Sequence, residues 1–469
     1  MKIQKPSVVI IGGGASGILV ATNLLLQCKT PLRISVVNSG SNVAKGVAYH
    51  PTSEDHLLNV MTGKMSAFPD DPDHFVHWLI SHSFSDIETE TLSKTYLPRK
   101  IFGEYLASVW KDAQDHKPDI IDIGMVSDRA TGVTRNGNSF IVHLKNGNEL
   151  EADYIVLASG NAAPRDPPIP NDQFYRSKFY YNNPWLATST ENLDHSGDVL
   201  IIGNGLTMVD TALSLIERRH KGVIHSLSPN GFGILQHRHN GIVYNGLVRE
   251  LPLANGLHQL VELFNKHVKK VRRLGLSAEP VIDSLRPLTQ SLWMSFSLNE
   301  KKKFMARLRH LWGVARHRLP IQVYDFIQKL KIEGKLKVWA GRIQNIQEVN
   351  GHAQVEFWDK KSKSLKTIFV SRVINCTGPE VDITKLNDDL FRNLLSSGLV
   401  SSDKLGLGLE ADSTTFQVLD KNGNAVDSFY AIGGLLRGLL WESTAIPEIR
   451  IQAKFIANQI INNELTKKK

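Results

Sequence analysis

Short apolar runs that end at glycine dominate the first part of the chain. Residues 8–11 read Val-Val-Ile-Ile and stop at Gly12, residues 18–26 are mostly apolar, and residues 34–37 read Ile-Ser-Val-Val. A run of four apolar residues bounded by glycine is typical of a buried strand, whereas the longer apolar stretch suits a helix. The pattern therefore predicts a strand, a tight turn, a helix and a second strand in succession.

The turn between the first strand and the helix is rich in glycine. Gly12, Gly14 and Gly17 fit the spacing G-x-G-x-x-G. In this spacing the first glycine allows the tight turn, the second lets a pyrophosphate approach the backbone, and the third lets the helix pack on the strand. The free N–H groups and partial positive charge of the helix N-terminus favour such an anion. Because the turn follows a strand and opens a helix, we predict that Gly12, Gly14, Ala15, Ser16 and Gly17 bind a dinucleotide.

The residue expected to hold the adenosine ribose of that dinucleotide is Asn38, which follows the second strand. This position usually carries Asp or Glu. An asparagine can still hydrogen-bond a hydroxyl group, although less strongly than a carboxylate does. Asn38 is therefore a predicted cofactor contact, but a weaker one than an acidic residue would be.

Two segments of the chain repeat the same organisation. Residues 129–160 and residues 342–378 each contain hairpin strands followed by an apolar strand that ends in Ser-Gly or Thr-Gly. Between them, the predicted strand Asp198-Val-Leu-Ile-Ile202 leads through a glycine turn into a predicted helix over residues 209–217, with Met208 in place of the third glycine. Together with the duplicated hairpins, this predicts a second dinucleotide-binding unit inserted in the first. Its expected coenzyme contacts are Gly203, Gly205, Leu206 and Thr207.

Glycine also follows the other strands that are predicted to border the two nucleotide sites. Gly160 and Gly378 end the two repeated segments, and Gly433 and Gly434 follow the apolar run Phe-Tyr-Ala-Ile at residues 429–432. Because ligands of such sheets bind beyond the carboxyl ends of the strands, we predict that all four glycines contact a cofactor.

The predicted fold class is α/β, with two dinucleotide-binding Rossmann-type domains, the second inserted in the first, and a helical addition. The expected boundaries are residues 1–190 for the first part of the first domain, 191–340 for the second domain and 341–469 for the return of the first. The helical addition is expected at about residues 246–334. A length of 469 residues agrees with two or three domains.

Composition argues against several classes of protein. The chain is 42% hydrophobic and 22% charged, as in a globular protein with a sizeable core, and no apolar run reaches the length of a membrane span. Its two cysteines, Cys28 and Cys376, lie far apart, which argues against a dithiol pair or a metal site. The net charge of +9 comes from basic residues spread along the chain, which does not favour nucleic acid as a partner. With no cleavage-site pattern after the first apolar run, we expect a cytoplasmic protein, and the pattern carries no signal for an oligomeric state.

Long loops beside a nucleotide site often build the reactive pocket. One such loop-rich region follows the second strand, and another stretch of aromatic and charged residues precedes the C-terminal helix, for which Ser443 or Thr444 is the predicted cap. For the first region, packing within the loop is the alternative to a role in the pocket. The six pocket candidates are Tyr49, His56, Asn59, Arg99, Trp441 and Glu442.

Motifs of one family are spread along nearly the whole chain. They are Gly12-x-Gly14-x-x-Gly17, Gly46-x-Ala48-Tyr49, His56-Leu-Leu-Asn59, Pro98-Arg99, Gly203-x-Gly205-Leu-Thr-Met-Val-Asp210, His317-Arg318, Asn375-Cys-Thr-Gly-Pro379 and Trp441-Glu-Ser-Thr-Ala-Ile-Pro-Glu-Ile-Arg450. In these motifs the chain resembles the FAD/NAD(P)-binding proteins that include the FAD-dependent urate hydroxylase and L-aspartate N-monooxygenase group. The motifs specify this family well but say little about the substrate.

By this resemblance, the first glycine unit binds FAD, the second binds NADPH or NADH, and the substrate reacts in the cleft between them. The implied protein is an FAD-dependent NAD(P)H oxidoreductase. Its expected activity is that of a monooxygenase which uses O2 to hydroxylate a small nitrogen-containing substrate, with an anionic group as one option, through a flavin C4a-hydroperoxide. Two alternatives stay open: a flavin reductase or oxidase that passes electrons to a partner, and a non-catalytic dinucleotide sensor.

Two departures from the family bear on this interpretation. Ser228-Pro229-Asn230-Gly231 stands where relatives place arginines after the serine, so the preference for the 2′-phosphate of NADPH is open. The most basic stretch of the chain, residues 301–318, is then either a solvated helix face or an anion site for the substrate or for that 2′-phosphate. Residues 174–180 lack the fingerprint of Baeyer–Villiger relatives, which does not support oxygenation of a ketone.

Overall fold

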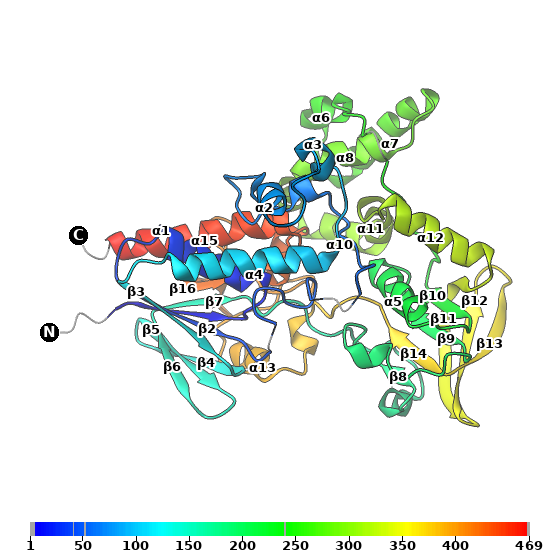
Figure 1. The fold of residues 1–469 in the computed structure, drawn as a ribbon, viewed down its shortest axis with the longest axis horizontal. Coiled ribbons are helices and arrows are strands. Elements are labelled where there is room, and N and C mark those ends of the chain that lie inside the picture. The colour runs from blue at the N-terminus through cyan, green and yellow to red at the C-terminus, as the bar shows by residue number, and fades with distance from the viewer. Residues whose placement is uncertain (1–4, 41, 51–52, 239–240, 467–469) are drawn as a thin grey trace.

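Two sheets, one nested within the other along the chain, form the frame of the protein (Figure 1). The computed structural model describes residues 5–40, 42–50, 53–238 and 241–466. The strands of the first sheet lie within residues 7–157 and 417–431, and those of the second lie within residues 180–375. The second unit is therefore inserted in the first, as the sequence predicts.

The first sheet has the strand order β15-β16-β7-β1-β2-β3, and all its neighbouring strands are parallel except β15 and β16. The expected strands at residues 8–11 and 34–37 are confirmed as β1 and β2. The strands are β1 (Ser7–Ile11), β2 (Leu32–Val37), β3 (Ile121–Val126), β7 (Tyr154–Leu157), β15 (Gln417–Leu419) and β16 (Ala425–Ala431).

β1 is buried on both faces, which explains its unbroken apolar run. Because side chains alternate along a strand, Val8 and Ile10 join the core beneath three helices, whereas Val9 and Ile11 join a second core on the opposite face. Figure 1 shows the helices on one side of the sheet and a small three-stranded sheet on the other. The helices are α1 (Ala15–Gln27), α4 (Arg99–Asp115) and α15 (Ile446–Thr466), and the opposite face carries β4 (Ala130–Asn136), β5 (Ser139–Leu144), β6 (Glu149–Ala152) and α13 (Asp389–Ser396).

The second sheet repeats this arrangement in the order β13-β12-β11-β10-β9-β14-β8. Val199 and Ile201 of β9 pack under helices α5 and α12, and Leu200 and Ile202 face the other core. The elements are β8 (Tyr180–Tyr181), β9 (Val199–Ile202), β10 (Ile224–Ser228), β11 (Leu336–Val349), β12 (His352–Asp359), β13 (Ser364–Val370), β14 (Arg372–Asn375), α5 (Leu206–Glu217) and α12 (Ile321–Ile332).

The strand pairing places the return to the first domain later than the predicted residue 341. β11 pairs with β10 and β14 pairs with β9, so residues 336–375 belong to the second sheet. β8, at residues 180–181, also pairs with β14, although the predicted first domain extends to residue 190. The hydrophobic pattern locates each strand but carries no information on its partner, and partners decide the boundary.

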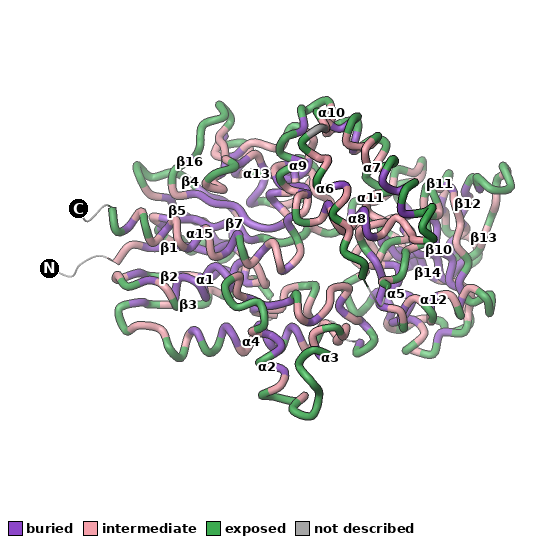
Figure 2. Tube along the Cα trace, turned by 90° about the horizontal axis from the view of Figure 1, so that it is seen from above, coloured by how far each residue is buried: buried purple, intermediate pink, exposed green. Residues whose placement is uncertain are grey.

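A helical addition connects β10 to the last helix of the second domain. α12 packs on the second sheet, so the addition ends earlier than the predicted residue 334. Figure 2 shows the central strands of both sheets as buried and the outer turns of the addition as exposed. Its helices are α6 (Gly246–Glu250), α7 (Gly256–Arg273), α8 (Glu279–Leu285), α9 (Thr289–Ser295), α10 (Leu298–Arg307) and α11 (Arg309–Arg316), and the first domain has the further short helices α2 (His74–His82), α3 (Thr89–Ser93) and α14 (Arg437–Leu440).

Candidate functional site: two nucleotide cradles and a coenzyme cavity

The first glycine loop has the geometry that its spacing predicts. Gly12 adopts φ +118°, and a Cβ there would overlap the carbonyl oxygen of Ala158. A Cβ on Gly17 would overlap the carbonyl oxygen of Gly12, so the third glycine lets α1 pack against the end of β1. Gly14 lies against Gly46, where a Cβ would come 3.6 Å from the Gly46 Cα. The turn and the packing role are therefore confirmed, and the pyrophosphate contact at Gly14 stays a prediction.

The N-terminus of α1 is left uncapped by the protein. Gly14 is the N-cap residue, no side chain accepts from the first turn, and that turn holds no acidic residue. The first backbone bond runs from Ile18 N–H to the Gly14 carbonyl at 3.0 Å. Among the described residues, the N–H groups of Ala15, Ser16 and Gly17 have no capping partner and can serve an anion.

Residues far apart in the sequence complete this first cradle. Asn38 lies beside the loop, where the N–H of Gly13 donates to its Oδ1 at 3.2 Å. Gly433 adopts φ +74°, and a Cβ there would lie 3.2 Å from Ser16 Oγ. The N–H of Gly433 donates to Gln452 Oε1 at 2.9 Å, which anchors α15 beside the loop.

Gly160, which follows β7, and Gly434 also lie at this edge, whereas Gly378 follows β14 and lines the second cradle. Gly160 has φ +73° and open space where a Cβ would be, and a Cβ on Gly434 would lie 2.8 Å from Asn161 Oδ1. Ser443, which precedes α15, is fully buried and its Oγ has no hydrogen-bond partner among the described residues. The expectation that Ser443 caps α15 is therefore wrong, and among the described residues the Thr444 side chain makes no hydrogen bond to that helix either. An uncapped helix, open glycines and an orphaned hydroxyl together fit FAD.

The second glycine loop repeats the first. Gly203 also has φ +118°, and a Cβ there would overlap the carbonyl oxygen of Cys376 at the end of β14. Gly205 is the N-cap residue of α5, whose first turn has no side-chain cap and no acidic residue. Met208, which replaces the third glycine, is buried in the core under the sheet. The Met208 side chain fills the space in which a glycine would let the helix pack closely on the strand.

A cavity of about 600 Å³ opens in front of this second loop. Four segments line it: the loop itself, the residues after β10, one face of α11, and the residues after β14. No described residue that lines it is acidic. The lining comprises Ile202–Thr207, Leu227–Asn230, Phe232, Ile234, Arg309, His310, Gly313, Val314, His317 and Cys376–Pro379.

None of the six pocket candidates lines this cavity. Two of them join the domains instead: Arg99 Nη1 lies 2.9 Å from Asp210 Oδ2 in a largely buried ion pair, and Arg99 Nε donates to the Leu57 carbonyl at 3.1 Å. His56 Nε2 donates to the carbonyl of Asp210 at 2.9 Å and lies 3.0 Å from Ser214 Oγ. Arg99 is thus already paired with a carboxylate, and the sequence could not show that this partner is on α5.

Trp441 and Glu442 connect the first domain to the helical addition. Trp441 adopts φ +61° and stacks on Trp293, with ring centroids 4.9 Å apart. Glu442 accepts from Trp312 Nε1 at 2.9 Å and from Arg316 Nε at 3.0 Å, both on α11. The segment that precedes α15 is therefore held against α11.

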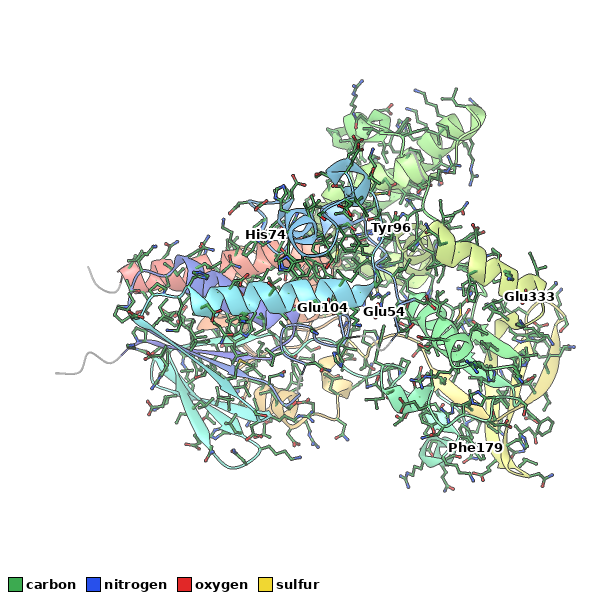
Figure 3. The ribbon with its side chains drawn as sticks, in the orientation of Figure 1. Glu54, His74, Tyr96, Glu104, Phe179 and Glu333 are labelled. Carbon is green, nitrogen blue, oxygen red and sulfur yellow. The ribbon has the colours of Figure 1, made fainter. Side chains whose placement is uncertain are left out.

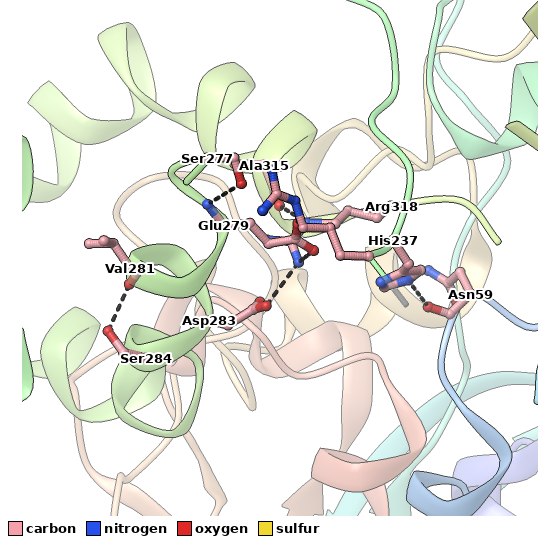
Figure 4. Close-up of polar contacts among 10 residues, drawn as sticks. Asn59, His237, Ser277, Glu279, Val281, Asp283, Ser284, Ala315 and Arg318 are labelled. Atoms are coloured by element: carbon pink, nitrogen blue, oxygen red, sulfur yellow. Dashed lines mark hydrogen bonds and ion pairs between the residues drawn. The ribbon is translucent and has the colours of Figure 1, made fainter. Parts of the chain in front are cut away.

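Tyr49 and Asn59 also contact neighbouring segments of the protein. The Tyr49 ring packs edge-on against Phe102 at 4.8 Å, and burial raises its pKa to about 12, with Arg99 opposing the shift. The carbonyl of Asn59 accepts from His237 Nε2 at 3.0 Å (Figure 4). His237 stacks on Tyr96 at 5.1 Å, and Figure 3 shows Tyr96 where the segment after α3 approaches the helical addition.

The basic stretch 301–318 is divided by the fold. Arg318 is buried and its Nη1 bonds Glu279 and, at 2.9 Å, Asp283 (Figure 4). Arg316 is paired with Glu442, whereas Arg309 faces the cavity. Arg316 and Arg318 are therefore neutralised within the protein, whereas an anion-binding role for Arg309 stays a prediction. Helical periodicity is the signal that separates them, once α11 is known to begin at Arg309.

Burial sets the state of two groups in the cavity wall. Burial raises the pKa of the Cys376 thiol to about 12, so the thiol stays protonated, and its Sγ lies 3.4 Å from Thr211 Oγ1. Desolvation, followed by the charge of Arg316, lowers the pKa of His317. At neutral pH the wall thus presents a neutral thiol and a neutral imidazole beside Arg309.

These features define a two-domain dinucleotide-binding fold, with a first glycine-loop cradle in the outer domain and a second cradle, which opens on the cavity, in the inserted domain. Residues 9–162 match the model of a family described as FAD-NAD(P)-binding, which confirms the predicted resemblance for that segment. No curated protein sequence matches the chain.

Solved structures share the fold over its whole length. The L-lysine 6-monooxygenase of Pseudomonas syringae is 16% identical, with TM-score 0.65, and the match covers 98% of this chain and 99% of that one. The reduced ornithine hydroxylase of Pseudomonas aeruginosa is 15% identical, with TM-score 0.64 and the same coverage. The ornithine N-hydroxylase of Kutzneria sp. 744, with reduced FAD, NADP+ and L-ornithine, is 13% identical, with TM-score 0.63 and coverage of 98% and 100%. At these identities the likeness is one of fold.

The described residues contain neither a membrane-spanning helix nor a metal-binding cluster. No helix in that part of the chain has both the length and the apolar character needed to cross a membrane. In the same residues, no three His, Cys, Asp or Glu side chains gather in a way that could hold a metal ion.

Proposed function

We propose that this protein is an FAD-dependent, NAD(P)H-using monooxygenase that hydroxylates a small nitrogen-containing substrate. The observation that carries the proposal is the position of α11. One face of this helix lines the cavity of the second cradle, and its other face holds Glu442 in the segment that precedes α15. A coenzyme in the cavity and a flavin in the first cradle would thus share one wall.

The residues of this chain supply binding and orientation. The uncapped starts of α1 and α5 offer N–H groups to the pyrophosphates of the two dinucleotides. FAD, when bound, supplies the chemistry of accepting hydride from the nicotinamide and of activating O2. Glu442, Arg316 and Trp441 hold the segment before α15 in place, and the helical addition packed on it helps to exclude water from the space between the domains.

The nitrogen-containing substrate is supported by the neighbours in fold. Those named above are an ornithine N-hydroxylase, a second ornithine hydroxylase and a lysine 6-monooxygenase, and all three match nearly the full length of this chain. The match includes the inserted domain and the region of the helical addition. We therefore infer a substrate with an oxidisable nitrogen, and O2 as the second substrate.

The test begins with the absorbance spectrum of the purified protein, which should show bound flavin. Anaerobic NADPH or NADH should then bleach the flavin band. In air, a panel of small amines and amino acids should contain a compound that stimulates coenzyme oxidation and gives a hydroxylated product in equal amount. Flavin reduction without any oxygenated product across the panel would instead favour a reductase or oxidase, and an absence of flavin reduction would favour a non-catalytic dinucleotide sensor.

A further inference from the structure

The helical addition presents a positively charged wall to the coenzyme cavity. Arg309, His310, Gly313, Val314 and His317 all line the cavity. Their spacing of one, four, five and eight residues from the first marks one face of a helix. Trp312 and Arg316 lie between these positions and turn instead to Glu442. The face that carries Arg309 therefore belongs to the cavity rather than to solvent alone.

Arg309 has no carboxylate to neutralise it among the described residues. Its Nε lies 3.3 Å from His310 Nε2, and none of the ion pairs of the described chain includes it. Burial, and next the charge of Arg309, lower the pKa of Arg437, so a second guanidinium lies within electrostatic range. Since no described lining residue is acidic either, the cavity carries an unbalanced positive charge.

The adenosine end of the cavity lacks the group that selects NADH. In a Rossmann unit, the residue after the second strand contacts the ribose, and a carboxylate there bonds the 2′-hydroxyl. Here that strand is β10, followed by Pro229 and Asn230, and the Ser228 hydroxyl accepts from Gly231 N–H at 3.0 Å. Ser228, Pro229 and Asn230 line the same cavity as Arg309. The loop thus offers the ribose neither a carboxylate nor an arginine of its own.

We propose that Arg309 binds the 2′-phosphate of NADPH, so that the helical addition, rather than the loop after β10, selects NADPH over NADH. This inference rests on the proposed use of a nicotinamide coenzyme. The pyrophosphate is served by the start of α5, which leaves the 2′-phosphate, with a charge of about −1.5 to −2 near neutral pH, to meet the unpaired guanidinium. An arginine can bind such a phosphate through two parallel hydrogen bonds.

One other cation lies near the adenosine end. Lys360 lies in the turn between β12 and β13, and its Nζ donates to Asn230 Oδ1 at 3.4 Å, but Lys360 does not line the cavity. Arg307 offers a matched control, because it is exposed, carries the same charge and lies outside the cavity two residues before Arg309. These two residues allow a local contact to be separated from a general loss of positive charge.

The experiment measures the dissociation constants of NADP+ and NAD+ by calorimetry for the holoenzyme and its variants. The unaltered protein should bind NADP+ more tightly. Arg309→Ala should weaken NADP+ by roughly tenfold or more, the size of a lost charge-assisted bond, and leave NAD+ within about twofold. Arg307→Ala and Lys360→Ala should leave the ratio of the two constants unchanged, and Arg309→Lys should recover part of it. Flavin content and melting temperature establish that each variant is folded.

Several results would overturn the inference while leaving the proposed function intact. Equal weakening of NADP+ and NAD+ by Arg309→Ala would assign Arg309 to the pyrophosphate. A change of the ratio in Lys360→Ala but not in Arg309→Ala would assign the 2′-phosphate to the β12–β13 turn. Equal affinity of the unaltered protein for both nucleotides would remove the selectivity altogether. Failure of both NADPH and NADH to reduce the flavin of the unaltered protein would instead refute the proposed function.

Discussion

The ion pair between Arg99 and Asp210 is expected to contribute strongly to the attachment of the inserted domain. Arg99 Nη1 and Asp210 Oδ2 are 2.9 Å apart, and the two side chains are only 12% and 9% exposed. Arg99 begins α4 in the first domain, and Asp210 lies on α5 in the second. Replacing Arg99 with alanine leaves the carboxylate of Asp210 buried without its partner and takes a donor from the Leu57 carbonyl. Breaking a buried pair in this way costs about 3–5 kcal/mol, a large share of the roughly 5–15 kcal/mol that stabilises a typical fold.

The assay is urea denaturation followed by circular dichroism, with the next residue as control. Lys100 pairs with Glu54 at 2.6 Å, but both side chains are more than half exposed. We expect Arg99→Ala to lower the denaturation midpoint markedly and Lys100→Ala to leave it unchanged, because solvent screens an exposed pair. Each variant removes one positive charge, and the two positions are adjacent in the chain. A general effect of net charge therefore cancels in the comparison.

A double variant isolates the unpaired charge. If the cost of Arg99→Ala arises from the stranded carboxylate, then removing Asp210 as well should recover part of the lost stability. Equal midpoints for Arg99→Ala and Lys100→Ala would refute the reasoning. The reasoning would also be refuted if Asp210→Ala lowered stability as much in the Arg99→Ala background as it does in the unaltered protein. The two residues would then act independently.

Three further predictions concern single residues. Gly12→Ala should lose flavin, measured as flavin absorbance relative to protein, because its Cβ would overlap the Ala158 carbonyl; Gly137→Ala, also at positive φ but with open space, should keep it. Cys376, with a thiol pKa of about 12, should react with a thiol reagent at pH 8 only after urea is added. Burial raises the pKa of Glu448, so stability is lost as pH rises from the pKa of the unfolded state through that of the folded state, where the carboxylate ionises. Glu448→Gln should therefore raise the melting temperature at pH 7 and not at pH 3. An equal shift at both pH values would contradict this.

Local structure around the two glycine loops could be predicted because it depends on neighbours in the chain. An apolar run, glycines at fixed spacing and a following helix are sufficient to specify the turn, and both loops adopt φ +118° at their first glycine. The long C-terminal helix was also predictable, since its apolar periodicity continues without interruption, although its predicted serine cap was wrong. The cofactor contacts assigned to these glycines stay predictions.

The pocket candidates show where such reasoning stops. The sequence predicts that His56 and Arg99 belong to the reactive pocket, but both contact Asp210, more than a hundred residues away. Glu442 likewise meets Arg316 of the helical addition. A polar side chain can either serve a reaction or hold two parts of the fold together. Its partner decides which, and the partner is set by the tertiary structure.

The sequence by itself determined that the chain contains two dinucleotide-binding units, one inserted in the other, because each unit is a short-range pattern of strand, glycine turn and helix. Only the tertiary structure decided which sheet the hairpin strands of residues 336–375 join, and which basic residues of the stretch 301–318 are neutralised. The physical reason is that strand pairing and charge pairing depend on distances between segments remote in sequence. Arg309 and Arg318 belong to one basic stretch, yet one faces a cavity and the other is buried against two carboxylates.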